Sequence, residues 1–491
     1  MSETKKYAEV NNIGRKSSEE HTVEDTQSKT ERKKTENTQN MTEGSPAGLI
    51  FRFAIPVMLG NMFQQVYIMT DTAIVGRAIG MDALAALGSV DWYNYMVLSV
   101  IQALTQGFGI RIAQEFGAER PEELKKAHAH SIVLSAAAMV LLLLFTQTTL
   151  PLMLTLLRVP AEIRPMSSMY MRVLFAGIPA QMLFNYCATA LRSLGNSRSP
   201  LHAMLAASGL NIVLDLLFVL VFHMGVGGAA LATILSQLVS GIWVLVAMRR
   251  ISYLTVEKRH YDKVPGLNMS LLRLSTPMVM QNALISAGGM VVTAVINGLG
   301  VIFLAGYSAT TKWYCVLEMA AIAYSYAVVT YMGQNYGAGK VERIHSGYRA
   351  SLLIAGVTSV IIGACMFIFA RPLTSLLMSG DPARVEAALK IAVHYMHIAA
   401  GCLPLLYLLY VTRATLQGIG DTVMTMISGI AELIVRLFMS LVAIRWMGGD
   451  AVLWGEVFAW IGADLVLCGA LFKHFRSPEL SLDNSGARSP R

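Results

Sequence analysis

Twelve long apolar runs constrain the fold of this chain more than any other feature of its sequence. They begin near residues 49, 83, 127, 166, 203, 228, 271, 304, 347, 389, 423 and 452. A helix needs about 20 predominantly apolar residues to cross the hydrocarbon core of a bilayer. Only 14% of the 491 residues are charged, compared with roughly 25% in a typical soluble domain. We therefore predict an all-α integral membrane protein with twelve transmembrane helices.

Short connectors separate most of the runs, so no large domain is expected outside the membrane. Residues 46–250 and 270–475 are expected to form an N-terminal and a C-terminal six-helix lobe, joined by a cytoplasmic linker at residues 251–269. Residues 1–45 lack the apolar pattern needed to bury a core, and they are expected to be a disordered cytoplasmic tail. Residues 476–491 are expected to be a second cytoplasmic tail. No short apolar stretch with a small-residue cleavage site precedes the first run, so no removable signal peptide is expected.

The formal charge of +8 raises the question of nucleic-acid binding. The basic residues stand in short connectors between apolar runs, where they set membrane topology, and no nucleic-acid partner is expected. Fifteen lysines and arginines, Arg192 and Arg413 among them, are assigned to connectors after even-numbered runs, and seven to connectors after odd-numbered runs. Because cytoplasmic loops carry the excess of Lys and Arg, both termini are predicted to be cytoplasmic. We expect a monomeric, multi-pass protein of the cytoplasmic (inner) membrane, with the lipid bilayer as its surroundings.

The two halves of the chain resemble each other at four places in the same order. The matching segments are LIFRFAIP (49–56) and LLRLSTP (271–277), AQEFGAERPE (113–122) and GQNYGAGKVE (333–342), YMRVLFAGIP (170–179) and YMHIAAGCLP (395–404), and ALRSLGNS (190–197) and TLQGIGDT (415–422). A repeat of six spans starts each half on the same side, so the predicted pseudo-two-fold axis runs along the membrane normal. Such an architecture suits a cavity between two lobes that rock against each other, which is how alternating access is commonly built.

Two acidic residues stand deep inside apolar runs of the first half. Asp71 lies in QQVYIMTDTAIVG, and Asp215 lies in LNIVLDLLFVL, where Asn211 is one helical turn away. An acid inside the membrane costs roughly 2.5–3.5 kcal/mol on insertion scales, which makes it a candidate functional group. Desolvation and a neighbouring like charge favour the protonated form of a carboxyl group, so these residues could load and release a proton or hold a small cation. The alternative is that each Asp caps a helix end or bonds a neighbouring backbone group.

The second half carries charged residues of its own. Glu432 and Arg436 are spaced i, i+4 in the favourable order, which predicts an ion pair within one helix. That pair is interpreted as structural, with a substrate or coupling role as the alternative and Glu456 as the acid partner if the pair opens. Lys312 and Glu318 are six residues apart and do not share a helix face, so no pair is inferred. Asp91 in SVDWYNYMV is either part of an aromatic site that recruits cations or an interfacial anchor.

Other chemistries have little support in the sequence. The five cysteines form no CxxC motif. HAH (128–130) opens a cytoplasmic helix end, and HYMH (394–397) lacks a third ligand nearby. Neither a zinc site nor any other metal or cofactor site is therefore predicted. An integral membrane enzyme would need a nucleophile with its base or a metal motif, and neither HExxH nor GxSxG occurs. Pro56, Pro179, Pro277 and Pro404 are repeat-related residues inside spans, where proline kinks a helix.

Several segments carry a family resemblance when they are taken in order. They are FAIPVMLGNMFQQVYIMTDTAIVG, the glycine-alanine loops, LRSLGNS, and NIVLD followed by GVGGAALATILSQ. Over residues 46 to 475 the chain resembles the multidrug and toxic compound extrusion (MATE) family of the MOP flippase superfamily. The resemblance implies an antiporter that expels amphipathic, mostly cationic compounds in exchange for protons or sodium. The nearest alternative is a lipid-linked precursor flippase of the same superfamily, which Arg172, Arg413 and Arg436 leave open.

In the DinF-like branch of that family the coupling site lies in the N-terminal lobe. The matching residues here are Gln64, Asp71, Tyr170, Asn211, Asp215 and Thr233. In the NorM-like branch an acid eight residues after the proline of span seven matters, and here that position is Ile285. The repeat places Val292 opposite Asp71 and Ser440 opposite Asp215, so the second half lacks this acid pair and the two lobes are expected to do different jobs.

Overall fold

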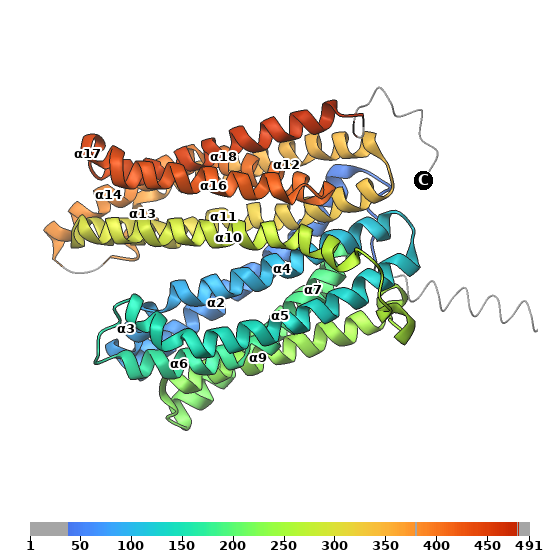
Figure 1. Cartoon of the computed structure of the whole chain (residues 1–491). Helices are drawn as coiled ribbons and strands as arrows, with labels where there is room; N and C mark the ends of the chain where they lie inside the picture. The colour runs from blue at the N-terminus through green and yellow to red at the C-terminus, as the bar shows by residue number, and fades with distance from the viewer. Residues whose placement is uncertain (1–37, 379–380, 479, 481–491) are drawn as a thin grey trace, which may run out of the picture.

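The regular structure of the described chain consists of helices (Figure 1). The computed structural model describes residues 38–378, 381–478 and 480. Ten helices are long and apolar enough to cross a membrane, and two further spans are helix pairs bent by 45° and 48°. The prediction of an all-helical membrane protein with twelve spans is therefore confirmed. The predicted disorder of the N-terminal tail concerns residues 1–37, which lie outside the described residues, as do residue 479 and residues 481–491 of the predicted C-terminal tail.

The N-terminal lobe contains the first six spans. Its helices are α2 (Pro46–Ala78), α3 (Met81–Gly88), α4 (Asp91–Gly117), α5 (Pro121–Leu156), α6 (Arg164–Ala176), α7 (Ile178–Ser193), α8 (Arg198–Asp215), η1 (Leu216–Val221) and α9 (Gly225–Arg249). The prediction that span two starts near residue 83 is wrong, because α3 ends at Gly88 and α4 starts a new helix at Asp91. Two serine hydroxyls, on Ser89 and Ser167, donate hydrogen bonds to the Ala86 carbonyl near the end of α3 and so help to terminate it.

The C-terminal lobe repeats this arrangement after a linker with two short turns. The linker contains η2 (Ser252–Leu254) and η3 (Lys258–Tyr261), and the lobe contains α10 (Leu267–Gly298), α11 (Val301–Gly337), α12 (Val341–Ile368), α13 (Ala370–Ser375), α14 (Pro382–Gly401), α15 (Leu403–Ile419), α16 (Thr422–Phe438), η4 (Met439–Ala443), α17 (Ile444–Met447) and α18 (Asp450–Arg476). The two bent spans are α6 with α7 and α14 with α15. Pro179 and Pro404 lie at these bends, whereas Pro56 and Pro277 lie inside the unbroken helices α2 and α10. The proline kinks are thus confirmed for one of the two repeat-related pairs.

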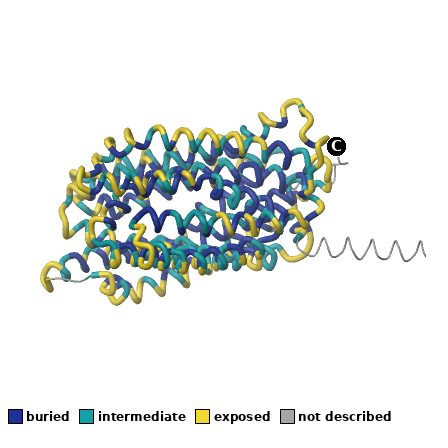
Figure 2. Tube along the Cα trace, turned by 90° about the horizontal axis from the view of Figure 1, so that it is seen from below, coloured by how far each residue is buried: buried dark blue, intermediate teal, exposed yellow. Residues whose placement is uncertain are grey.

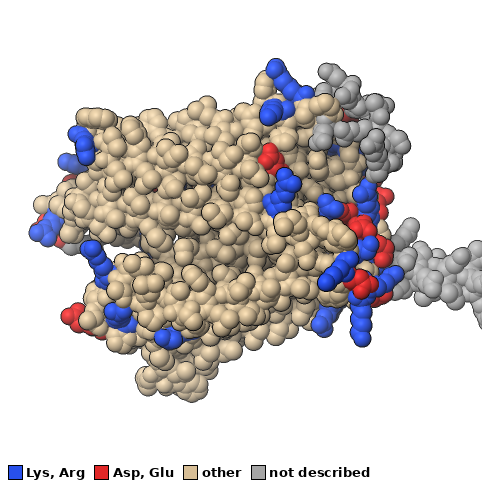
Figure 3. Space-filling view, in the orientation of Figure 1, with Lys and Arg blue, Asp and Glu red and all other residues tan. Residues whose placement is uncertain are grey.

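The outer surface is apolar along the middle of the spans and charged at both ends. Leu141, Leu353 and Leu465 are exposed large side chains in the interior of α5, α12 and α18. Figure 2 shows exposed residues on the outward turns of the helices and buried residues toward the inside. In Figure 3 the charged side chains gather mostly toward the two ends of the molecule and leave a largely uncharged band between them. This band is the surface that lipid would cover, since exposed aliphatic side chains suit a hydrocarbon solvent.

Each lobe's first helix begins against the other lobe. Ile50 and Phe53 of α2 are buried in the same apolar cluster as Met332 of α11 in the second lobe. In the same way Leu271 of α10 belongs to a cluster with Phe108 of α4 in the first lobe. Both helices therefore tie the lobes together at the end where the described chain starts and finishes. Toward the opposite end the lobes diverge, and a hollow separates them (Figures 1 and 3).

At the closed end, α4 and α11 touch through two glycines. A Cβ atom on Gly117 would lie 1.9 Å from the carbonyl oxygen of Gln334, and one on Gly337 would lie 1.8 Å from the carbonyl oxygen of Gln114. No larger residue fits either position without moving the backbone of the facing helix. Each glycine follows its own helix's glutamine by three residues, so the contact obeys the pseudo-two-fold relation.

The same two glutamines bond across the interface. Gln114 Nε2 donates to the Gly418 carbonyl oxygen at 3.1 Å, and Gln334 Nε2 donates to the Ser193 carbonyl oxygen at 2.9 Å. Ser193 and Gly418 are themselves repeat-related, within LRSLGNS and LQGIGDT. Two equivalent side-chain bonds therefore cross between the lobes beside the glycine contacts.

A segment preceding α2 crosses this junction. Within residues 38–44, the Gln39 N–H donates to the Leu194 carbonyl oxygen of the first lobe at 2.9 Å. The Met41 N–H donates to Gln334 Oε1 of the second lobe at 2.8 Å, and Arg343 Nη2 donates to the Met41 carbonyl oxygen at 3.1 Å. Met41 is completely buried. The segment thus adds bonds to both lobes at the closed end.

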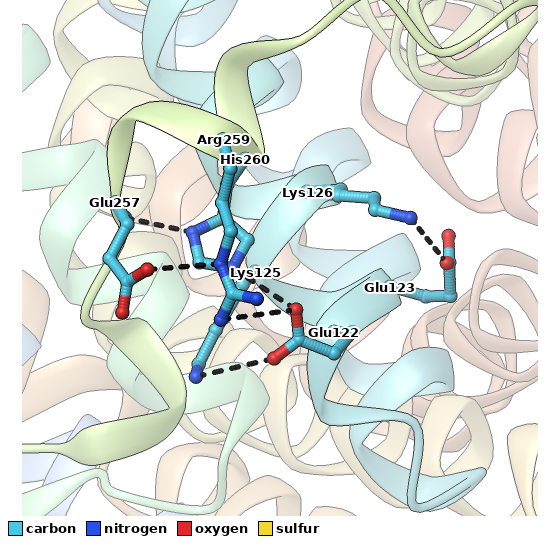
Figure 4. A network of polar contacts seen from close by, with 7 residues as sticks. All are labelled: Glu122, Glu123, Lys125, Lys126, Glu257, Arg259 and His260. Atoms are coloured by element: carbon cyan, nitrogen blue, oxygen red, sulfur yellow. Dashed lines mark hydrogen bonds and ion pairs between the residues drawn. The ribbon is translucent and has the colours of Figure 1, made fainter.

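The inter-lobe linker is held against the first lobe by a polar network (Figure 4). The Glu257 N–H donates to His260 Nδ1 at 2.8 Å, so His260 Nε2 carries the hydrogen that faces Glu122 Oε2 at 3.3 Å. Arg259 pairs with both Glu257 and Glu122 at this surface. His260 itself is buried. The linker is therefore attached to α5, and Gly266, with φ of 80°, separates it from α10.

The closed end should depend on Gly337. Replacing Gly337 with Val places side-chain atoms where the Gln114 carbonyl oxygen now lies, so the lobes should separate at this end. Spin labels on exposed Arg198 and Arg349, in a background without native cysteines, would report the change as a longer distance in double electron–electron resonance. Gly356→Val is the matched control, because a Cβ at Gly356 meets no atom within 4 Å. An unchanged distance in Gly337→Val would contradict the glycine contact.

Candidate functional site

A polar cavity of about 420 Å³ lies in the N-terminal lobe and faces α11 of the second lobe. Its polar lining residues are Asn61, Gln64, Tyr67, Asp71, Thr72, Asp91, Asn94, Gln102, Tyr170, Gln181, Asn185, Arg192, Asn211, Thr233, Ser236, Gln237, Ser240, Lys312 and Tyr326. They come from α2, α4, α6, α7, α8, α9 and α11. A pocket of this size with converging polar groups can hold a small organic molecule.

Five of the six residues expected from the family resemblance line this cavity. Gln64 and Asp71 come from α2, Tyr170 from α6, Asn211 from α8 and Thr233 from α9. These positions are spread over 170 residues of sequence, and the fold of the lobe gathers them around one space. Their proposed part in coupling remains a prediction.

The sixth residue, Asp215, lies next to the cavity and is completely buried at the end of α8. Both of its carboxylate oxygens, both side-chain polar atoms of Asn211 and Oδ1 of Asp71 are buried without a hydrogen-bond partner. Asp71 and Asp215 lie within electrostatic reach of each other. Neither residue caps a helix through its side chain. Because an unpaired buried charge costs several kcal/mol, this group of atoms is suited to bind a proton or a cation.

A π-helical turn directly follows Asp215. The turn η1 begins at Leu216, and η4 in the second lobe begins at Met439, next to the repeat partner Ser440. Such turns are rare and occur frequently at functional sites. Since the turn occurs in both lobes and the acid in only one, the scaffold does not require the carboxylate.

The structure adds three residues of α9 that were not singled out in the sequence. Ser236, Gln237 and Ser240 line the cavity beside the expected Thr233. Their spacing of i, i+3, i+4 and i+7 places them on one helix face, so a polar stripe in an apolar helix would have identified them. Asp91 also lines the cavity, at the first residue of α4. Its role as a cation-recruiting group remains a prediction.

Two of the arginines that were assigned to connectors have side chains in the protein interior instead. Arg192 is part of α7 and lines the cavity, with its guanidinium carbon 4.7 Å from the centre of the Tyr326 ring. Arg413 is part of α15 and is buried. A count along the sequence cannot distinguish a connector from the end of a helix.

The predicted ion pair between Glu432 and Arg436 is wrong. Glu432 pairs with Arg413 of α15, and Arg436 pairs with Glu456 of α18 at 2.7 Å. The helix α16, which carries both residues, packs against α18 and also contacts α15. Each charge therefore finds its partner on a neighbouring helix, where the long side chains meet more directly than along one helix face.

Further acids lie in the same part of the second lobe. Tyr410 donates a hydrogen bond to Glu318 Oε1, and Asp464 is buried with no hydrogen-bond partner for either carboxylate oxygen. Arg172 is exposed. The three arginines that left a flippase open are thus exposed or already paired with glutamates. Among the described residues no three His, Cys, Asp or Glu side chains form a possible metal site.

Comparison with known proteins agrees with the duplicated fold. The MatE family model matches residues 56–217 and again residues 277–442, which are the two repeats. The chain belongs to the MATE family. It is therefore a multi-pass membrane protein of a family of small-molecule transporters.

Individual relatives match most of this MATE protein's sequence, and a solved structure shares its fold. The chain is 28% identical over 308 residues to the probable multidrug resistance protein YpnP of Bacillus subtilis, covering 62% of this chain and 68% of that one. It is 22% identical over 417 residues to the multidrug export protein MepA of Staphylococcus aureus, covering 84% and 90%. An outward-facing multidrug resistance MATE transporter has the same fold, with a TM-score of 0.83, 24% identity and coverage of 90% and 99%.

The pair of Arg436 and Glu456 is expected to be structural. Glu456→Gln leaves the Arg436 guanidinium without a counter-ion in a mostly buried place, which should cost about 3–5 kcal/mol and lower the midpoint of thermal unfolding. The double variant Arg436→Met with Glu456→Met removes both charges and should recover most of that loss. Tryptophan fluorescence of the purified protein in detergent measures both effects.

Glu386→Gln provides the control, because its pair with Arg371 at 2.9 Å is exposed and should contribute little. A Glu456→Gln variant that unfolds at the same temperature as this control would contradict the structural role. If the double variant is stable but does not transport substrate, the pair of Arg436 and Glu456 has a role in transport instead.

Proposed function

We propose that this MATE protein is a secondary active multidrug exporter that takes amphipathic, mostly cationic compounds into the cavity of the N-terminal lobe. Export is driven by protons that enter through Asp71 and Asp215. The observation that carries this proposal is the group of buried, unpartnered oxygens on these two acids beside a cavity of about 420 Å³. Loading a proton neutralises a buried carboxylate, and this shifts the balance between two arrangements of the lobes.

A proton is the simpler occupant of this site. One proton removes the charge of a carboxylate, whereas a metal cation needs about six oxygen ligands in a defined geometry. The unpartnered oxygens here are one from Asp71, two from Asp215 and one from Asn211. Ile285 in α10 adds no acid on the side of the second lobe. These features favour proton coupling over sodium coupling.

We propose that the protein is a monomer in the cytoplasmic membrane. Its closed end and both termini then face the cytoplasm. The basic residues of the connectors at the closed end support this orientation. The cavity then opens to the outside, between the diverging lobes (Figure 3). For the substrate to enter from the cytoplasm, the contacts of Gly117 and Gly337 must separate. Alternating access in this protein is thus the breaking and re-forming of one junction.

Removing either acid should abolish coupled transport. Asp215→Asn and Asp71→Asn keep the shape of the side chain but cannot exchange a proton, so efflux of a cationic dye driven by a pH gradient should fall to that of vesicles without protein. Asp82→Asn, an exposed acid on α3, should transport normally. Size-exclusion chromatography shows that each variant is folded. Full efflux by Asp215→Asn would reject the assigned coupling site.

The coupling ion can be determined by separating the two gradients. Proteoliposomes with a pH gradient in sodium-free buffer should export the dye, and a sodium gradient at equal pH should not drive export. Addition of substrate to the detergent-solubilised protein should release protons, and Asp71→Asn should reduce that release. A strict requirement for sodium would overturn the choice of the proton while leaving the site itself in place.

A further inference from the structure

Arg192 is a cation at the floor of the cavity. It is the last but one residue of α7, and the next residue, Ser193, accepts the bond from Gln334 that closes the lobes. The Ser193 hydroxyl also donates to the Gly109 carbonyl oxygen at 2.8 Å, which fixes the end of α7 to α4. Arg192 therefore sits directly beside the junction, at the end of the cavity where the lobes meet.

The guanidinium of Arg192 has no acidic partner. Its carbon lies 4.7 Å from the centre of the Tyr326 ring, and its Nε atom is buried without a hydrogen-bond partner. No carboxylate in the described part of the chain lies within 4.0 Å of it, in contrast to Arg413 and Arg436 of the second lobe. An aromatic face offsets only part of the cost of removing a guanidinium from water.

The repeat shows that the fold does not need this charge. In the alignment of ALRSLGNS with TLQGIGDT, Arg192 corresponds to Gln417, a neutral residue of α15. The same end of the same span is thus built in the second lobe without an arginine. The charge therefore needs an explanation beyond packing.

The other charged groups of the cavity are placed differently. Asp71 and Asp91 lie within electrostatic reach of each other, and Lys312 lies within reach of Asp91. Asp91 is the first residue of α4, far along that helix from Gly117 at the closed end. The acids thus belong to the open part of the cavity, whereas the unpaired arginine belongs to its floor.

We propose that Arg192 contacts the substrate and selects amphipathic molecules that carry an anionic group, a carboxylate or a phosphate, beside their apolar or cationic part. This inference rests on the proposed function and names the substrate class of the same cavity. A guanidinium presents a planar pair of donors that matches a carboxylate or phosphate. The anionic group of the substrate supplies the missing partner of Arg192 at the floor, while the cationic part faces the acids. Binding of the anion also competes with the contact between Arg192 and Tyr326, which joins the two lobes.

Two dyes that differ in a single charge test the inference. A rhodamine with a free carboxylate and its methyl ester share the same cationic ring system, and fluorescence anisotropy gives the affinity of the purified full-length protein for each. The wild-type protein should bind the free carboxylate more tightly than the ester. Arg192→Gln should weaken binding of the carboxylate dye by about tenfold, since a charge-assisted hydrogen bond is lost, and leave the ester unchanged. Arg192→Lys should restore part of the difference.

The variants also separate this inference from the proposed mechanism of export. Asp71→Asn should abolish coupled efflux but still bind the carboxylate dye more tightly than the ester. That result would show that coupling depends on Asp71 and that the preference for the anionic group does not. The role of Arg192 in substrate selection would be overturned by either of two results. The wild-type protein could bind both dyes with equal affinity, or Arg192→Gln could weaken the binding of both dyes equally. Arg192 would then be only a contact between the lobes. Binding of neither dye would overturn both the substrate class and the multidrug cavity.

Discussion

The contact between α4 and α11 at Gly117 and Gly337 determines how the two lobes can be arranged. Each glycine faces a carbonyl oxygen of the other helix, so the contact is between two backbones, with no side chain to bend. Such a contact is either formed or broken, because packed interfaces switch between discrete arrangements more readily than they deform. The bonds of Gln114 and Gln334 act in the same direction. Because the lobes are held together at the Gly117 and Gly337 contact, the cavity opens at the opposite end of the molecule.

The repeat separates the scaffold from the chemistry. Both halves keep the bent spans, the π-helical turns and the glutamine with its following glycine, all of which shape helices or bring them together. The charged residues of the cavity are not repeated. Asp71 corresponds to Val292, Asp215 to Ser440 and Arg192 to Gln417. One lobe thus carries the scaffold together with a charged cavity, and the other carries the scaffold alone at these positions.

Much of the fold could be predicted from the sequence. Backbone groups in lipid must form hydrogen bonds within helices, so each span needs a minimum length of apolar residues. The spans, the repeat and the residues of α2, α6, α8 and α9 that gather at the cavity followed from that pattern and from the family resemblance. The partners of Glu432 and Arg436 could not be predicted in this way. The i, i+4 rule considers a single helix, whereas their partners lie on two neighbouring helices, α15 and α18. Arg192 was missed because hydropathy cannot distinguish a helix end inside the protein from a connector.

The two lobes also differ in how their interior arginines are balanced. In the second lobe, Arg413 and Arg436 each have a glutamate partner, so their charges need nothing from outside the protein. In the first lobe, Arg192 has no carboxylate partner, and Asp71 and Asp215 have buried oxygens without hydrogen-bond partners, as Asp464 has in the second lobe. An unbalanced buried charge is stabilised by a proton or ligand that neutralises it. If the binding free energy of that proton or ligand differs between two arrangements of the lobes, binding shifts the balance between them. Because Arg192 lies next to the bond between Ser193 and Gln334, this imbalance extends to the junction that must open. We therefore expect the first lobe to move in response to a proton or a substrate, while the paired arginines of the second lobe stay in place.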